Sequence, residues 1–95
     1  MAISSTNPAT GETLKKFDPL SGGQIEEKLA AAARAFDQHR HDPFAERASL
    51  LLRVASLLEQ EKDRLARVIT LELGKLLSAS VEEVLNCARG CRFYA

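Results

Sequence analysis

Residues 50–73 read LLLRVASLLEQEKDRLARVITLEL, and the apolar side chains in this stretch recur at helical spacing. A repeat of three and four residues places such side chains on one face of a helix. The stripe consists of Leu50, Leu51, Val54, Leu57, Leu58, Leu65, Val68, Ile69 and Leu73. The polar run Glu59–Arg64 interrupts it, which predicts a bend between two helices of ordinary length.

Boundary signals flank this helical region. Asp42 is predicted as the N-cap, with Pro43 at the first helical position, where its missing N–H costs nothing. Gly74 is predicted to close the region in a left-handed conformation. A last helix is expected from about Ala79 to the end of the chain. Its candidate buried positions are Val81, Val84, Leu85, Ala88 and Tyr94.

An earlier helix is predicted upstream of Asp42. Ser21 and Gln24 have the spacing of a capping box, in which each side chain bonds the backbone of the other residue. The helix should continue to about His39. Its expected buried stripe consists of Ile25, Leu29, Ala32, Ala33 and Phe36.

Residues 3–17 predict a β-hairpin. The segment Asn7–Gly11 is rich in turn residues: Pro8 presets φ, and Gly11 can adopt the left-handed conformation that closes a hairpin loop. Two strands alone are only marginally stable, so this ribbon needs a surface to lie on.

Length and composition restrict the function classes. Ninety-five residues form one small domain at most, and 45% apolar residues are too many for a disordered chain. Thirteen acidic and thirteen basic residues leave a formal net charge of zero, which disfavours nucleic acid and acidic membranes as partners. No apolar run approaches the roughly 18 residues of a membrane span, and the first residues lack a secretory pattern. We therefore expect a cytoplasmic protein.

The histidines and cysteines are the first candidates for a metal site or a catalytic nucleophile, and we interpret both pairs as structural. His39 and His41 are two apart in a helix, so they point to different sides, and a solvated helix end is the favoured interpretation over a metal site. Cys87 and Cys91 share a helix face, where packing is favoured over a disulfide, a metal site or a nucleophile.

The remaining candidates are also interpreted as structural. Glu72 and Lys75 have the spacing of a surface ion pair worth roughly 0.2–0.5 kcal/mol. Glu82 and Glu83 are adjacent and face different ways, so they make a poor acid–base pair. Gly22-Gly23 lacks the further glycines and the lysine of a phosphate loop. We therefore predict no catalytic, cofactor-binding or metal-binding residue within positions 1–95.

Three stretches, in this order, resemble the aldehyde dehydrogenase superfamily. They are Asn7–Glu12; Phe44–Arg47 with Leu51, Ala55, Leu58 and Leu65-Ala66 following; and Thr70–Lys75 followed by Glu83 and Tyr94-Ala95. One departure is Leu76, where family members usually have proline. The short lead before Asn7 and the phrase Cys87–Ala95 look most like bacterial succinate-semialdehyde dehydrogenases.

The resemblance implies an α/β parent fold with a Rossmann-type cofactor domain. In a complete parent chain, a cysteine thiolate attacks the aldehyde, hydride passes to NAD or NADP, and a glutamate activates water to release the acid. Residues 1–95 would be the N-terminal part of the cofactor-domain region, a hairpin at 3–17 and three to four mostly amphipathic helices over 21–95. The catalytic domain would lie in the remainder of the chain, which would be the partner of this segment within a homo-oligomer.

Two hypotheses remain open. The first is a piece of an aldehyde dehydrogenase, whether a truncated product, a split reading frame or an incomplete sequence, because the predicted elements do not close on themselves. Such a piece should be poorly folded or sticky and inactive on its own. The alternative is a stand-alone helical module for protein–protein contact, which should unfold cooperatively and form a defined oligomer.

Overall fold

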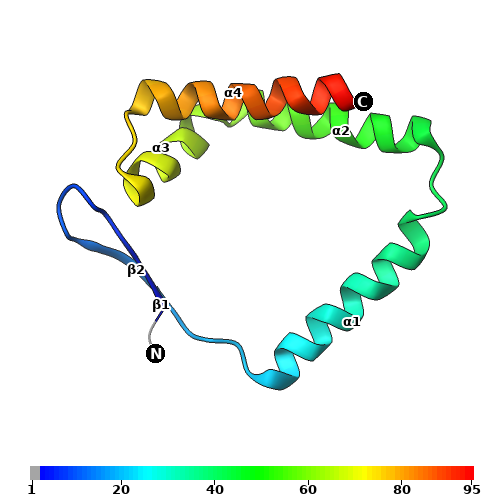
Figure 1. Cartoon of the computed structure of the whole chain (residues 1–95), viewed down its shortest axis with the longest axis horizontal. Helices are drawn as coiled ribbons and strands as arrows, with labels where there is room; N and C mark the ends of the chain where they lie inside the picture. Colours follow the sequence, from blue (N-terminus) through cyan, green and yellow to red (C-terminus); the bar gives the residue numbers. More distant parts are fainter. Residues whose placement is uncertain (1–2) are drawn as a thin grey trace.

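The computed structural model describes residues 3–95. An antiparallel hairpin is followed by four helices, as Figure 1 shows. This architecture confirms the predicted hairpin and helices. The elements are β1 (Ile3–Thr6), β2 (Thr13–Phe17), α1 (Gly22–His39), α2 (Phe44–Gln60), α3 (Lys62–Leu73) and α4 (Leu77–Tyr94).

The hairpin loop is held by Asn7 and Gly11. The Asn7 carbonyl accepts the Gly11 N–H at 2.8 Å, and the Asn7 side-chain oxygen accepts the Ala9 N–H at 2.9 Å. Gly11 has a φ of 76°, as a residue closing such a loop requires. The register pairs Ile3 with Phe17 and shifts between Ser5 and Thr6, where one extra residue enters the ladder.

The N-terminus of α1 carries the predicted capping box. Ser21 Oγ accepts the Gln24 N–H at 3.2 Å, and Gln24 Oε1 accepts the Ser21 N–H at 2.9 Å. Two of the donors that every helix start leaves without partners are therefore satisfied locally. The helix ends at His39, as predicted.

The prediction for the start of α2 is wrong by one residue in position, and it is also wrong in the residue that caps the helix. The helix begins at Phe44, Pro43 is the N-cap, and no side chain caps the first turn. The Asp42 carboxylate instead lies 2.8 Å from Nδ1 of His39, and the Asp42 N–H donates to the His39 carbonyl at 3.0 Å. Asp42 therefore folds back onto the end of α1 and is not free to cap α2.

The boundary between α2 and α3 and the end of α3 lie where the sequence predicts them. The bend between α2 and α3 falls at Glu61, with φ −97° and ψ 9°, inside the predicted polar run. Gly74 closes α3 with a φ of 72°, and its N–H donates to the Thr70 carbonyl at 2.9 Å. Helix α4 begins at Leu77, two residues before the predicted start.

The elements form one thin layer. Helix α4 packs along α2 and α3, β1 contacts α3, and α1 packs against no other element of the described part. Figure 1 shows α2 and α4 side by side, with the hairpin near α3 and α1 projecting away from them. The Cα atoms span 47 × 38 × 15 Å. A stable domain normally has at least two layers around a shared core, and this arrangement has one.

The buried core is small and made of small residues. Its members are Ala55, Ala66, Ser80, Val84 and Ala88. They lie where α2, α3 and α4 meet. Their small side chains let the backbones of these helices approach one another closely. Thr70 and Ser80 join hydroxyl oxygens across this contact at 2.9 Å. The prediction of Val84 and Ala88 as buried is confirmed.

Most of the other predicted core residues are not buried. Helix α1 has no buried residue, so the expected burial of its stripe is wrong, and Tyr94 is also exposed. The physical cause is the single layer, which leaves one side of each stripe uncovered. The stripe residues now exposed are Ile25, Leu29, Ala32, Ala33, Phe36, Leu50, Val54, Leu57, Val68 and Leu73. Those half-buried are Leu51, Leu58, Leu65, Ile69, Val81 and Leu85.

Candidate functional site

The two histidines lie at an exposed helix end, as expected. His39 is the last residue of α1, and its ring contacts Asp42. His41 follows in the turn and is exposed. Among residues 3–95, no group of three histidine, cysteine or acidic side chains is placed to share a metal ion.

Cys87 and Cys91 lie on successive turns of α4 as free thiols. Cys91 is half-buried, whereas Cys87 is exposed, so the packing interpretation is wrong for Cys87. The Cys87 side chain lines an apolar groove instead.

The predicted ion pair between Glu72 and Lys75 is wrong. The Lys75 ammonium pairs with Glu83 at 2.5 Å, and Glu72 accepts the Ser5 hydroxyl at 2.7 Å. The left-handed Gly74 ends the helix between the two residues, so the spacing rule for one helix face no longer applies. Glu82 bonds Arg89 at 3.0 Å, which confirms that Glu82 and Glu83 face different ways.

The hairpin is joined to α3 at two points. One is the hydrogen bond from Ser5 Oγ to Glu72 Oε1. The other is a close approach of Pro8 to Gly74, where a Cβ added to the glycine would stand 3.0 Å from Pro8 Cγ. The hairpin therefore lies on the C-terminal end of α3, which provides the surface that a two-stranded ribbon needs.

An apolar groove runs along α3. One part, of about 270 Å³, is lined by Leu58, Leu65, Val68, Ile69, Glu83, Val84 and Cys87. A neighbouring part, of about 160 Å³, lies under the hairpin and is lined by Ser5, Leu14, Lys15, Phe17, Val68, Leu71 and Glu72. The two parts share Val68, so the groove connects the helical layer with the hairpin.

A larger hollow, of about 520 Å³, lies between α3 and α4. It is lined by Asp63, Arg64, Arg67, Leu77 and Val81. Arg64 is already paired with Glu61, and Asp63 lies 4.0 Å from the Lys62 ammonium. The charges here are mixed and solvated, so the hollow does not select a ligand of one sign.

An ion pair with two hydrogen bonds joins α2 to α4. Arg92 donates from Nε and Nη2 to the two oxygens of Glu59, at 3.0 and 2.7 Å. These hydrogen bonds, together with the charge of Arg92, hold the pKa of the Glu59 carboxyl below its ordinary value of 4.5. The same bonds raise the pKa of Arg92. This two-point geometry fixes the helix pair more firmly than a single contact does.

Arg47 fixes the joint between α1 and α2. Its guanidinium donates to the carbonyls of His39 at 3.1 Å, Arg40 at 3.0 Å and Asp42 at 3.2 Å. These carbonyls lie at the end of α1 and in the following turn, where helix termini leave acceptors unsatisfied. Sequence reasoning missed this role of Arg47. The signal in the sequence was the short distance of Arg47 from the predicted end of the preceding helix.

No helix within residues 3–95 combines the length and apolar character needed to cross a membrane. The described residues present structural contacts and exposed apolar side chains.

Comparisons with known proteins agree with the resemblance described above. The profile of the aldehyde dehydrogenase family matches residues 1–95. A succinate-semialdehyde dehydrogenase of Mycobacterium leprae, its cofactor given as NADP(+), is 43% identical over all 95 residues, which cover 21% of that protein. A probable enzyme of the same name from Synechocystis sp. and succinate-semialdehyde dehydrogenase 1 of Mycobacterium tuberculosis H37Rv are each 44% identical, with the same coverage. The chain spans about a fifth of the length of these relatives, at their N-terminal end.

Proposed function

This chain belongs to the aldehyde dehydrogenase family, and we propose that it is the N-terminal structural segment of an enzyme that oxidises succinate semialdehyde to succinate with NADP⁺. The substrate and cofactor rest on the names of relatives that are 43–44% identical over the whole chain. The role of the segment is to pack against the remainder of the enzyme.

The observation that carries this proposal is the mismatch between the apolar side chains and the core. Among residues 3–95 only five are buried, four of them apolar, and none is larger than valine. Leu29, Leu57 and Leu73 are each more than half exposed. A chain that forms regular helices but covers so little of their apolar faces is expected to be completed by further layers.

The start of α1 is a poor place for a dinucleotide phosphate. The first turn of α1 is the glycine-containing helix start, but Ser21 already occupies one of its amides. The nearest charged side chains on that helix are Glu26 and Glu27, which repel a phosphate. We therefore propose that the cofactor and the catalytic groups are held by the remainder of the enzyme, and we assign no catalytic step to residues 3–95.

We further propose that the enzyme is cytoplasmic and that it is a homo-oligomer, as the family resemblance implies. The relatives are bacterial, and both cysteines of the chain are free thiols, which suits a reducing compartment.

The direct test is to capture the native product with an antibody against this segment and to assay it. The captured enzyme should reduce NADP⁺ when succinate semialdehyde is added, and the isolated 95-residue chain should not. Parallel assays with NAD⁺ and with unrelated aldehydes establish cofactor and substrate preference. Turnover by the isolated chain, or a captured product without aldehyde oxidation, would contradict the proposal.

A further inference from the structure

Helix α4 carries two thiols on one face. Cys87 and Cys91 lie on successive turns of an uninterrupted helix, and both are free. Residues four positions apart on a helix have their Cβ atoms about 5–6 Å from each other. Cys87 is exposed and Cys91 is half-buried, so rotation about the Cα–Cβ bond of Cys87 can change the separation of the two sulfur atoms. One small ion can therefore contact both sulfur atoms without a change in the helix backbone.

A bridging ion suits this pair of thiols better than a disulfide does. A disulfide requires a Cβ–Cβ distance of about 3.5–4.5 Å, which is shorter than a regular helix provides at this spacing. A metal–sulfur bond in a protein is about 2.3 Å long, so a linear sulfur–metal–sulfur bridge spans roughly 4.6 Å. The longer bridge matches two cysteine side chains on successive turns of one helix.

The neighbouring polar groups already have partners. The Glu83 carboxylate pairs with the Lys75 ammonium, and the hydroxyl groups of Ser80 and Thr70 share a hydrogen bond. Within the described part of the chain, no third histidine, cysteine or acidic side chain is placed to complete a larger metal site. Structural zinc sites are almost always four-coordinate, so two sulfur ligands do not suit Zn²⁺.

The surroundings of Cys87 are apolar. Its side chain lines the groove of about 270 Å³ on α3, together with Val84 of the same helix and with Leu65 and Val68 of α3. Such walls provide no oxygen ligands, so they disfavour Mg²⁺ and Ca²⁺, which bind through oxygen. An apolar shell also limits the access of water to a bound metal ion.

We propose that Cys87 and Cys91 form a binding site for one monovalent copper ion, held between the two sulfur atoms. Thiolate sulfur is a soft ligand that selects Cu(I), whereas hard cations prefer oxygen. Binding releases the two thiol protons and forms two copper–sulfur bonds, and neither copper nor sulfur changes its oxidation state. The bound ion connects two turns of α4 and stabilises the helix against local opening.

The test uses the complete gene product that contains residues 1–95, kept free of oxygen and with its thiols reduced. Copper is supplied as the coloured Cu(I) complex of bathocuproine disulfonate, and the loss of colour measures how much copper the protein removes. Wild type is compared with Cys87→Ser and Cys91→Ser. The matched control combines Cys91→Ser with Arg89→Cys, which keeps the number of thiols but places them two residues apart, on different sides of the helix.

Wild type should bind one more copper ion than either serine variant. At this site it should bind copper at least about 100-fold more tightly than the matched control, because two linked ligands gain about 10²–10⁴-fold over one. The X-ray absorption difference between wild type and Cys87→Ser should show two sulfur neighbours around copper. Copper should slow amide exchange of residues 87–94 at least about tenfold in wild type and leave it unchanged in Cys91→Ser.

Equal copper stoichiometry and affinity in wild type and Cys87→Ser would overturn the proposal. An undiminished affinity in the matched control would also overturn it, because the spacing of the thiols would then be irrelevant. A copper spectrum with fewer than two sulfur neighbours would have the same meaning. If the serine variants do not fold, Cys87→Ala and Cys91→Val remove the same ligands with apolar side chains, and the same loss of copper binding is expected.

Discussion

Gly74 at the end of α3 lies directly against Pro8 in the hairpin loop, so close that an added Cβ would stand 3.0 Å from Pro8 Cγ. Gly74 also has a φ of 72°, where a side chain is strained. Gly74→Ala should therefore cost the strain of about 1–2 kcal/mol and also push the hairpin away from α3. The local free energy of opening of α3 checks this. It is measured by amide exchange in a chimeric enzyme in which residues 1–95 replace the matching segment of the 44% identical Mycobacterium tuberculosis enzyme.

Gly11 provides the control for that substitution. Its φ of 76° is almost the same, but no atom of residues 3–95 lies within 4 Å of its added Cβ. Gly11→Ala should lose stability through the backbone strain alone. Pro8→Ala should recover part of the loss in a Gly74→Ala background, and equal effects of the two glycine substitutions would show that the contact with Pro8 is unimportant.

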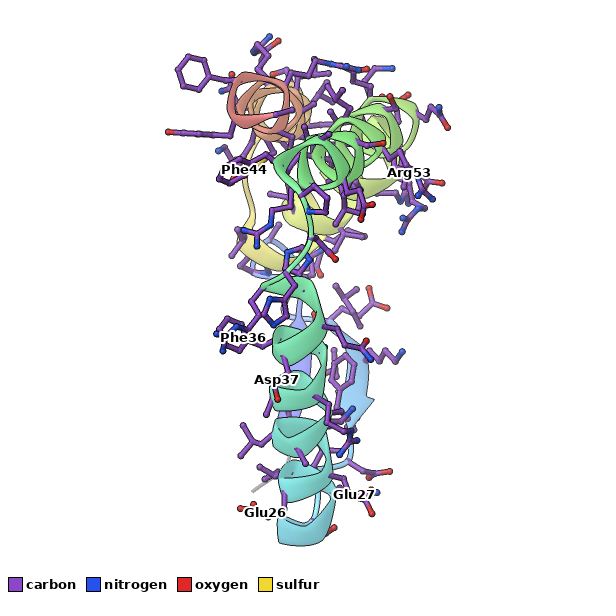
Figure 2. The ribbon with its side chains drawn as sticks, turned by 90° about the vertical axis from the view of Figure 1, so that its right-hand side faces the viewer. Glu26, Glu27, Phe36, Asp37, Phe44 and Arg53 are labelled. Atoms are coloured by element: carbon purple, nitrogen blue, oxygen red, sulfur yellow. The ribbon has the colours of Figure 1, made fainter. Side chains whose placement is uncertain are left out.

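Arg47→Lys should loosen the joint between α1 and α2. Lysine cannot donate from a rigid fork to three carbonyls, so we expect a loss of about 1.5–3 kcal/mol in the local stability of residues 39–43. Amide exchange of that turn measures the loss. Arg53→Lys on the same helix is the control, because no hydrogen bond to its side chain is seen within residues 3–95 and Figure 2 shows it away from the joint. Matching effects of the two substitutions would rule out the carbonyl contacts as the cause.

Glu59→Gln should destabilise the contact between α2 and α4 in a pH-dependent manner. The pKa of Glu59 is lower in the folded chain than its ordinary value of 4.5. The stabilisation that the ionised Glu59 carboxylate provides is therefore fully present above pH 4.5 and is lost as pH falls through the lower pKa of the folded chain. The difference in urea midpoint between wild type and variant should therefore be small but measurable at neutral pH and should shrink below pH 4.5. Glu46→Gln, on the same helix, should show no such change. A difference that grows on acidification would contradict the pairing with Arg92.

Ala88→Leu should disrupt the small core. Ala88 is 1% exposed where α4 meets its neighbours, so three extra carbons force the helices apart at a cost of about 1–3 kcal/mol. Urea unfolding of the chimera measures the loss. Ala45→Leu, an exposed position on α2, should change stability by less than about 0.5 kcal/mol. A neutral Ala88→Leu would mean that the helices are not closely packed there.

Local signals in the sequence predicted most of the elements. The hairpin loop at Asn7–Glu12, the capping box of Ser21 and Gln24 and the left-handed Gly74 each involve residues within a few positions of one another, and all three are confirmed. Such features depend on backbone geometry that the local sequence determines.

The contacts that sequence reasoning missed involve residues far apart or past a helix end. Ser5 and Glu72 are 67 positions apart, and Lys75 turns to Glu83 only because Gly74 redirects the chain. Asp42 was a good candidate cap, but His39 lies close enough to take its carboxylate. No pattern within one element contains these pairings.

Burial was the least predictable property. Apolar periodicity identifies which face of a helix avoids water, but it does not identify what covers that face. Leu29 and Leu57 therefore read as core residues and are 59% and 58% exposed, whereas the inconspicuous Ala55 and Ala66 are fully buried. The assignment of the family rested on motif order instead, and it did not depend on burial.

The measurement that tests the central claim most directly is the mass of the native product, by immunoblot of a lysate of the source organism with an antibody against residues 22–39. Because the chain covers 21% of its relatives, the account predicts a band about five times heavier than 10.4 kDa. A band only near 10.4 kDa would contradict it, since no later segment would then exist to cover α1 or to supply the catalytic groups.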